Sequence, residues 1–229
     1  MKKLTFFTGA GISAESGIKT FRDSDGLWEN HNVMDVASVS GWRKNKDLVL
    51  EFYNQRYKQL SEVEPNDGHK LISDLQKTFD VNVITQNVDN LHERAGTEKV
   101  LHLHGELTKM CSSMDKEQTL PYKEIKIGDK HPDGSQLRPY IVWFGEDVPM
   151  FNDAIKLVKQ SEVFVIVGTS LQVYPAASLI DFVNSKTEIY YIDPNPSFDD
   201  IHYTLKERIN VIKKIGSEGM KDLYEKLTS

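Results

Sequence analysis

The sequence of 229 residues has one cysteine, no long apolar run and no excess of positive charge. The single cysteine, Cys111, excludes an intrachain disulfide framework and fits a reducing compartment, so we expect a cytoplasmic protein. No stretch approaches the ~20 apolar residues that span a bilayer, which predicts no association with a membrane. The net charge of −6 argues against direct nucleic acid binding, because contacts with phosphates need clustered Lys and Arg.

Short apolar runs alternate with helical patterns along most of the chain. The apolar runs predict strands at 4–8, 81–85, 100–103, 140–144, 163–167 and 188–192, and the helical patterns lie at about 44–60, 66–78, 152–160, 174–185 and 217–227. Strands rich in Val and Ile that alternate with helices are typical of an α/β fold. We predict a Rossmann-like parallel sheet with helices on both faces.

Two stretches interrupt this alternation. Residues 20–77 are polar and then helical, without a convincing strand, and residues 107–139 are loop-like. We interpret them as insertions that build a smaller lobe from 21–77 and 107–139, beside a larger lobe of 1–20, 78–106 and 140–229. Because ligands of such sheets bind beyond the carboxyl ends of the strands, the residues that follow each strand are the candidates for a site.

The first predicted strand ends in TGAGISAESG, where Gly9, Gly11 and Ala14 fit the pattern G-x-G-x-x-G/A before a predicted helix. This is the context of a dinucleotide-binding turn, although a tight turn without a ligand is the alternative. A standard dinucleotide fold has a second strand that ends in an acid about 20 residues on. That region here is FRDSDGLWENH, which is no strand, so a dehydrogenase is disfavoured.

The strand at 81–85 is followed by TQNVDNLHERAG, which places Gln86, Asn87 and Asp89 at its carboxyl end. Amide side chains suit ribose hydroxyls and carboxamides, because they offer both a donor and an acceptor. A helix N-cap would explain one of the three residues but not all of them. His92 falls on the following predicted helix without an evident partner, and we expect a structural role for it.

The segment LHLHGELTKMCSSM, residues 101–114, contains two histidines and the cysteine. His104 ends a strand at the same edge as the motifs above, and an imidazole is a natural general base near neutral pH. We predict that His104 is catalytic and that His102, one pleat deeper, is structural.

Three more strand ends carry small or polar groups that suit a ligand, with a turn or a helix cap as the alternative at each. They are Gly145 and Glu146; Gly168, Thr169 and Ser170 at a predicted helix start; and Asp193 and Asn195.

The motifs GAGIS, TQNVDNLH and HLHGE, with FGE and GTS downstream, together resemble the sirtuin family of NAD-dependent protein deacylases. The resemblance extends from about residue 4 to about residue 196. It implies a Rossmann-like lobe and a small lobe, with NAD and an acyl-lysine peptide between them. The implied reaction removes acyl groups from protein lysine and yields nicotinamide and O-acyl-ADP-ribose.

The resemblance also implies residue roles. His104 is the general base, Gln86, Asn87 and Asp89 hold nicotinamide and its ribose, and the cofactor loop comprises Gly9, Ala10, Gly11, Ala14, Phe21 and Arg22. Gly168, Thr169 and Ser170 contact phosphates and the adenosine ribose, with Asp193 and Asn195 at the adenosine end, where the family usually has Asn in place of Asp193. Val142, Phe144, Gly145, Glu146 and Val173 belong to the segments that pair with the substrate backbone.

The segment EFYNQRY places Tyr53 and Arg56 on one face of a predicted helix, at positions i and i+3. An Arg fork can bind a carboxylate, and a Tyr hydroxyl can add a further hydrogen bond. A subclass of sirtuins has Tyr-x-x-Arg in the acyl pocket with a small Ala opposite, which Ala37 matches here. The resemblance therefore implies activity on succinyl-, malonyl- or glutaryl-lysine in addition to acetyl-lysine.

Sirtuins usually bind a structural zinc through two C-x-x-C pairs. The matching positions here are Cys111 with Met114 and Lys130 with Asp133, and His131 does not complete a tetrahedral set. We predict no zinc and no other metal. The small lobe is then held by packing, with Leu107, Leu120, Ile125 and Ile127 inside.

Two alternatives stay open. The same site could transfer ADP-ribose to protein or hydrolyse NAD, because both reactions share the first bond cleavage. A non-catalytic module that binds NAD or ADP-ribose is the other alternative, against which the intact His104 argues.

Overall fold

A computed structural model describes residues 1–19, 27–28 and 30–229. Its main sheet has six strands in the order β11-β10-β9-β1-β4-β5, and every neighbouring pair is parallel. The strands are β1 (Lys3–Thr8), β4 (Asp80–Thr85), β5 (Val100–His102), β9 (Val163–Val167), β10 (Glu188–Ile192) and β11 (Ile209–Ile212). The chain builds outward from β1 in both directions, so the strand order reverses beside β1. The predicted Rossmann-like fold is confirmed.

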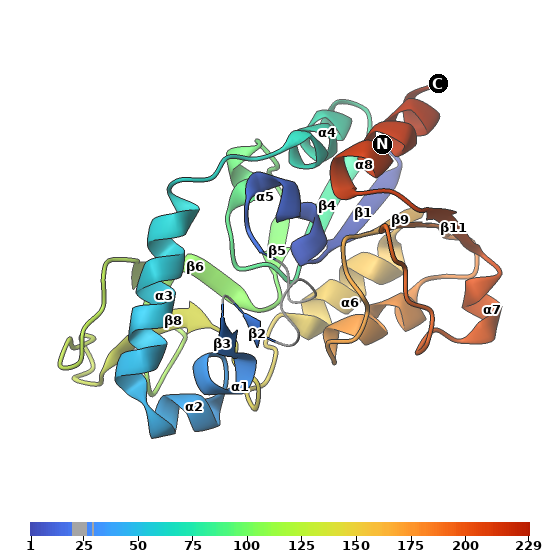
Figure 1. Cartoon of the computed structure of the whole chain (residues 1–229). Helices are drawn as coiled ribbons and strands as arrows, with labels where there is room; N and C mark the ends of the chain where they lie inside the picture. The colour runs from blue at the N-terminus through green and yellow to red at the C-terminus, as the bar shows by residue number, and fades with distance from the viewer. Residues whose placement is uncertain (20–26, 29) are drawn as a thin grey trace.

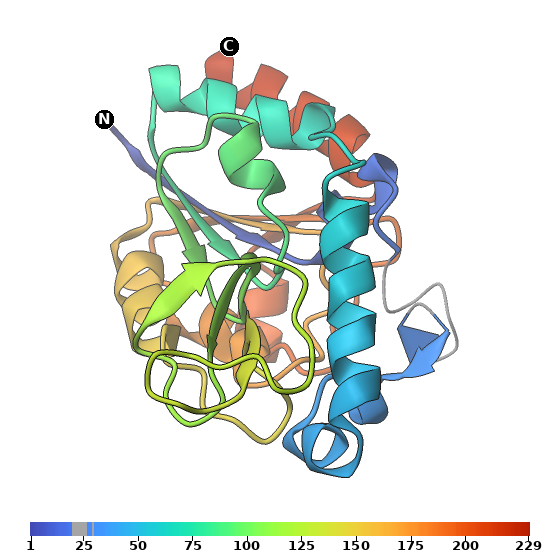
Figure 2. The same cartoon turned by 90° about the vertical axis from the view of Figure 1, so that its left-hand side faces the viewer.

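Successive residues of each strand pack into two separate hydrophobic cores, because their side chains point to opposite faces of the sheet. Phe6 packs on one face with Ile72 and Met220, and Phe7 packs on the other face with Val158 and Leu179. The first face is covered by α4 (Asp67–Asp74), η4 (Leu75–Lys77) and α8 (Gly216–Thr228), and the second by α6 (Phe151–Gln160) and η5 (Ala176–Phe182). Figures 1 and 2 show α4 and α8 lying side by side. Burial on both faces explains the continuous apolar runs of these strands.

A second, antiparallel sheet lies beside the larger one with the order β7-β6-β8. Its strands are β6 (Gly105–Ser112), β7 (Thr119–Pro121) and β8 (Leu137–Ile141). The short pair β2 (Leu27–Trp28) and β3 (His31–Asn32) precedes α1 (Val33–Val36), α2 (Val39–Lys44) and α3 (Lys46–Leu60), which complete this part at the left of Figure 1. Its core joins Trp42, Phe52, Tyr53, Tyr122 and Trp143.

Several predicted elements were wrong. Residues 107–139 are not loop-like, because they contribute to all three strands of the second sheet; a register shift between Gly105 and Met110 and the edge position of Pro121 hide the two-residue alternation. The strand expected at 140–144 ends at Ile141 and pairs with β6, not with the parallel sheet. The strand β11 was not predicted, because it is short and half-exposed at the sheet edge.

The helices expected at the two glycine-containing turns also differ. The first turn continues as two short 3-10 helices, η1 (Ala10–Ile12) and η2 (Ala14–Ser16). The segment after Gly168 reaches η5 only at Ala176, so Thr169 and Ser170 do not begin a helix. The remaining helices, α5 (Leu91–Arg94) and α7 (Tyr203–Lys206), are one turn each. No helix in the described ranges is long and apolar enough to cross a bilayer.

Packing of the small sheet follows most of the prediction. Leu107 and Ile125 are buried and Leu120 packs against the same core. Ile127, by contrast, is 50% exposed, so its predicted place inside was wrong.

Candidate active site

The candidate site lies at the carboxyl ends of β1, β9 and β4. The turn after β1 is tied to the turn after β9, since the Gly9 N–H donates to the Val167 carbonyl at 3.0 Å and the Gly11 N–H to the Gly168 carbonyl at 2.8 Å. The strand order reverses at this point, which is where open α/β sheets bind ligands.

Close packing of these two turns requires glycine. A Cβ on Gly9 would lie 2.6 Å from Thr169 Cβ, and one on Gly11 would lie 2.6 Å from the Gly168 Cα. Gly168 itself has a φ of +62°, which L side chains rarely adopt. The glycines are therefore needed for contact between the two turns as well as for any approach of a ligand. Ala14 is exposed in η2, and Ala10 is half-buried.

Hydrogen bonds from two side chains orient the turn at 168–170, and two backbone N–H groups of this turn remain without an acceptor in the described part of the chain. Gln86 Nε2 donates to Thr169 Oγ1 at 2.9 Å, and the Tyr191 hydroxyl donates to the Thr169 carbonyl at 2.7 Å. Within the described part of the chain, the N–H groups of Thr169 and Ser170 donate to no acceptor. Consecutive backbone N–H groups of this kind suit an anion such as a phosphate.

Asn87 and Asp89 meet at a side chain that the sequence analysis missed, Ser13. Asn87 Nδ2 donates to Ser13 Oγ at 3.1 Å and to the Gly9 carbonyl at 3.2 Å, and Ser13 Oγ donates to Asp89 Oδ2 at 3.0 Å. Asp89 Oδ1 also accepts from the Leu91 N–H at the start of α5. Burial raises the pKa of Asp89. The position of Ser13 next to the glycine motif was the available signal.

His104 lies between β5 and β6 and is half-buried. Its Nδ1 lies 3.0 Å from the carbonyl oxygen of Gln86. A carbonyl only accepts, so Nδ1 carries the proton and Nε2 of the neutral ring has a free lone pair. Nε2 has no hydrogen-bond partner among residues 1–19, 27–28 and 30–229, and burial lowers the pKa of His104. The ring is therefore set up to take a proton at neutral pH.

His102 bonds to the same loop, one residue further along. Its Nδ1 lies 3.0 Å from the Asn87 carbonyl and its Nε2 lies 2.7 Å from Glu93 Oε1. Burial opposes the charged form, but the hydrogen bond and the charge of Glu93 outweigh it and raise the pKa of His102.

His92 is buried and has a hydrogen-bond partner. Its Nε2 lies 3.0 Å from Thr8 Oγ1, which donates to Thr85 Oγ1. Its ring packs edge-on against His69, with centroids 4.9 Å apart. Burial lowers the pKa of His92 well below its ordinary value and that of His69 to about 4, so both rings stay neutral beneath the site.

The segment 142–145 runs beside His104 and the second sheet. The Val142 N–H donates to the His104 carbonyl at 2.9 Å. Phe144 exchanges backbone hydrogen bonds with Ala37 and Val39, while its side chain remains 45% exposed. Gly145 follows with a φ of +92°. Phe144 and Gly145 line one end of a groove of about 620 Å³ that also includes Met34 and Arg43.

Glu146 faces inward. Its carboxylate accepts from Arg138 at 2.7 Å and from the Trp143 N–H at 2.8 Å, and it pairs with Lys116 at 2.7 Å. The Glu146 N–H donates to the Trp143 carbonyl. Both its side chain and its N–H are therefore used to close a turn.

The residues of the predicted acyl pocket lie together in the core of the smaller sheet. Tyr53 is fully buried, and its hydroxyl accepts from Trp143 Nε1 at 3.1 Å. Burial raises the pKa of Tyr53, so the hydroxyl keeps its proton, and no acceptor in the described part of the chain takes that proton. Ala37 belongs to the same buried cluster, and the Arg56 guanidinium lies 5.3 Å from the Phe52 ring centroid. An acyl group reaches the Tyr53 hydroxyl only if neighbouring side chains move apart.

The remaining residues predicted for the site make local backbone contacts or lie outside the described residues. Asp193 is buried and accepts from the Asn195 N–H at 2.8 Å, which closes a turn. The Val173 carbonyl accepts from the Ala177 N–H. Phe21 and Arg22 lie outside the described residues.

Of the four positions matched to zinc ligands, Asp133 takes part in a hydrogen-bonded cluster and Met114 is exposed. Ser112 Oγ lies 2.7 Å from Ser135 Oγ, and the Ser135 N–H donates to Asp133 Oδ1 at 2.8 Å. Cys111 is buried, which raises the pKa of its thiol to about 11, and its Sγ faces the Pro139 carbonyl. Across the described ranges, no three His, Cys, Asp or Glu side chains gather in a group that could hold a metal ion.

The fold and the site together define a Rossmann-like protein with a histidine and an amide cluster at the reversal of its strand order. A model of the Sir2 family matches residues 9–175. The chain is 53% identical to an NAD-dependent protein deacylase of Bacteroides thetaiotaomicron, over 99% of this chain and 98% of that protein. It is 54% identical to an NAD-dependent protein deacylase of Helicobacter pylori, also over 99% and 98%.

Solved structures agree. A Sir2 homologue in complex with NAD superposes with a TM-score of 0.86 at 33% identity, over 99% of this chain and 90% of that one. A mutant Sir2 homologue in complex with ADP-ribose superposes with a TM-score of 0.87 at 33% identity, over 99% and 92%. The chain belongs to the Sir2 family, which confirms the resemblance drawn from its motifs.

Proposed function

We propose that this protein uses NAD to remove acyl groups from lysine side chains of proteins or peptides, releasing nicotinamide and O-acyl-ADP-ribose. The observation that carries the proposal is His104, a half-buried imidazole whose Nδ1 is fixed on the Gln86 carbonyl and whose Nε2 has no hydrogen-bond partner among the described residues. The names of the relatives, NAD-dependent protein deacylases at about half identity over nearly the whole chain, support the same activity.

NAD fits the arrangement of donors. The uncommitted N–H groups of Thr169 and Ser170 suit its phosphates, and the Asn87 and Gln86 amides suit the nicotinamide and its ribose. Bound as a substrate, NAD supplies the ribose carbon that the acyl oxygen attacks. The residues proposed to contact it are Gly9, Ala10, Gly11, Ala14, Phe21, Arg22, Gln86, Asn87, Asp89, Gly168, Thr169, Ser170, Asp193 and Asn195.

In this reaction His104 takes a proton at Nε2, while its Nδ1–H stays on the Gln86 carbonyl. The fixed Nδ1 hydrogen bond orients the ring and selects the tautomer, so no rearrangement is needed before proton transfer. A positioned base of this kind contributes about 10² to 10⁴ in rate.

The substrate peptide is proposed to lie along the edge formed by Val142, Phe144 and Gly145, with Glu146 and Val173 alongside. The exposed Phe144 side chain and the groove beside Gly145 support this placement. Glu146 contributes by closing the turn rather than by contacting the peptide with its carboxylate.

We also propose that the acyl pocket accepts acidic acyl groups. The Tyr53 hydroxyl is a donor whose proton is uncommitted, Arg56 supplies a charged fork one helical turn away, and Ala37, a small side chain, belongs to the same buried cluster as Tyr53. A succinyl, malonyl or glutaryl carboxylate would complete this arrangement, alongside activity on acetyl-lysine.

The limits of the two lobes are proposed to differ from those expected. Ile72 and Leu75 pack with the parallel sheet, which supports assigning α4 and η4 to the larger lobe. The pairing of β8 with β6 supports assigning residues up to Ile141 to the smaller lobe.

A buried single cysteine agrees with a reducing, cytoplasmic location.

The direct test is to incubate the protein with peptides that carry acetyl-, succinyl-, glutaryl- or long-chain acyl-lysine, with and without NAD. We expect loss of the acetyl and acidic acyl groups only when NAD is present, with one nicotinamide released per acyl group. NAD cleavage that leaves every acyl peptide intact would contradict the proposal.

A further inference from the structure

His102 is held by two acceptors that lie on opposite sides of its ring. Its Nδ1 lies 3.0 Å from the carbonyl oxygen of Asn87, and its Nε2 lies 2.7 Å from Glu93 Oε1. A carbonyl and a carboxylate are both acceptors, so each of the two contacts needs an N–H. A neutral imidazole has only one N–H, whereas the imidazolium has two. The geometry is that of a charged ring.

The surroundings of His102 contain more negative than positive charge. Glu93 on α5 bonds to it directly, while Glu106 on β6 and the buried Asp89 act on it from a distance. Lys109 faces this cluster from β6 and pairs with Glu106 at 2.6 Å. His92 on α5 is also nearby, and burial keeps it neutral. The His102 side chain is only 7% exposed, whereas Glu93 is 39% exposed.

The loop held by His102 is the one that carries the proposed NAD-binding amides. His104 bonds to the carbonyl of Gln86, and His102 bonds to the carbonyl of the next residue, Asn87. His102 and His104 are two residues apart in an extended segment, so their side chains lie on the same face, against this loop. Asn87 in turn orients its side chain toward Ser13 and the Gly9 carbonyl.

We propose that Glu93 holds His102 as an imidazolium and that this cation is a positioning residue, which fixes Asn87 and the 86–89 loop for the reaction. The proposal rests on the proposed function, since it assigns His102 a part in that same site. His104 must be neutral to act, whereas His102 must be charged to hold the Asn87 carbonyl and the Glu93 carboxylate at the same time, which ties the loop to α5. Activity therefore requires a pH above the pKa of His104 and below that of His102, a window set by two residues of one segment.

The decisive experiment follows both rings and the reaction in the same protein. The imidazole resonances of His102 and the backbone amide of Asn87 are recorded by NMR from pH 5 to 9, and kcat/KM for deacetylation is measured over the same range. The variants are Glu93→Gln, which keeps the shape of the side chain, and Glu98→Gln, which removes the same charge from an exposed residue that bonds only through its backbone.

We expect His102 to titrate above pH 6.5, with the Asn87 amide changing at the same midpoint and the alkaline fall of kcat/KM coinciding with it. Glu93→Gln should move all three to lower pH, while Glu98→Gln should leave them in place. A His102 midpoint that is not raised, or that Glu93→Gln does not lower, overturns the imidazolium. Midpoints that shift while the pH profile stays fixed, with activity merely scaled, overturn the positioning role.

The NMR arm separates this proposal from the proposed function. If the protein shows no NAD-dependent deacylation, that function fails, and the His102 and Asn87 titrations still decide whether the cation holds the loop. Glu93→Gln tests the contact without removing the His102 ring, and Glu93 is 39% exposed, so this replacement does not disturb a packed core.

Discussion

The two ends of the segment 101–114 serve different parts of the molecule. At its start, His102 and His104 bond to the carbonyls of the loop at 86–89, at the edge of the parallel sheet. At its end, Cys111 is buried in the second sheet and Ser112 bonds to Ser135 within that sheet. Residue types that look like one metal-binding cluster are thus divided between a reactive edge and a packed core. What a His or Cys does is decided by which acceptors its strand places opposite it.

The largest expected effect is the loss of activity when His104 is replaced, which tests whether this end of the segment is the reactive one. His104→Ala should lower kcat/KM for deacylation by about 10² to 10⁴, because the open Nε2 is lost, while the fold and NAD binding remain. Steady-state kinetics and calorimetric titration with NAD check both parts. His202→Ala, which replaces an exposed histidine at the start of α7, is the matched control and should retain activity. A His104→Ala protein with most of its activity would mean that the reactive edge lies elsewhere.

Next in size is the effect expected at the ion pair between Arg138 of the second sheet and Glu146. Arg138 is 4% exposed and bonds to Glu146 and to the Ile141 carbonyl, and its guanidinium lies 3.3 Å from the Trp143 ring centroid. Arg138→Met should lower the free energy of unfolding by about 3 kcal/mol, because it leaves Glu146 without its buried partner. Denaturant unfolding measures this loss.

The matched control for that ion pair is Lys126→Met, which breaks an exposed pair with Glu124 in the same part of the chain. It should change stability by no more than about 1 kcal/mol. Equal losses in the two variants would show that the buried Arg138–Glu146 pair stabilises the fold no more than an exposed pair does.

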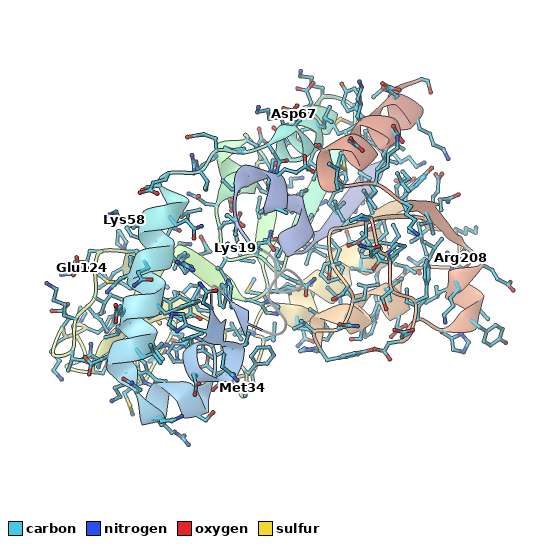
Figure 3. All side chains as sticks on the ribbon, viewed as in Figure 1. Lys19, Met34, Lys58, Asp67, Glu124 and Arg208 are labelled. Atoms are coloured by element: carbon cyan, nitrogen blue, oxygen red, sulfur yellow. The ribbon has the colours of Figure 1, made fainter. Side chains whose placement is uncertain are left out.

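A selective effect is expected at the acyl pocket. Arg56→Met should lower desuccinylation about 10- to 100-fold, which corresponds to the loss of a charged hydrogen bond of about 1.5–3 kcal/mol, with little change in deacetylation. Parallel kinetics on acetyl- and succinyl-lysine versions of one peptide measure the ratio. Lys58→Met, on the same helix at the outer side of the molecule in Figure 3, should leave the ratio unchanged. An equal loss of both activities would remove Arg56 from acyl recognition.

The pH dependence on the acid side follows from His104. Burial lowers the pKa of His104 below its ordinary value of 6.5, and the base must be neutral to act. Activity should therefore rise with pH through a midpoint below 6.5. A pH profile of kcat/KM checks this, and an acid limb centred above 6.5 would be inconsistent with the burial of the ring.

The smallest expected effect is that of a metal chelator. Cys111 and Asp133 are engaged with neighbouring groups of the second sheet, so EDTA should not change the melting temperature, and elemental analysis should find far less than one zinc per chain. About one zinc per chain, with a lower melting temperature after chelation, would restore the metal-site interpretation of Cys111.

The sequence predicted the position of the site more accurately than it predicted the helices and strands around the site. The strands on both sides of β1 consist mostly of buried apolar residues, so the residues beyond their carboxyl ends, such as Asn87 and Thr169, could be placed at one edge in advance. The second sheet could not, because its register shift after Gly105 and the Pro121 edge interrupt the alternation that marks a strand. Ser13, Glu93 and His69 were missed because their roles depend on contacts between distant segments, which no local pattern contains.

The central claim is tested most directly by the products formed from NAD and an acetyl-lysine peptide. Mass spectrometry of the quenched reaction should find nicotinamide, O-acetyl-ADP-ribose and the free-lysine peptide in equal amounts. A peptide that carries ADP-ribose would indicate a transferase, free ADP-ribose with the acetyl-lysine intact would indicate an NAD hydrolase, and bound NAD with no product would indicate a binding module. Any of these three results would contradict a deacylase.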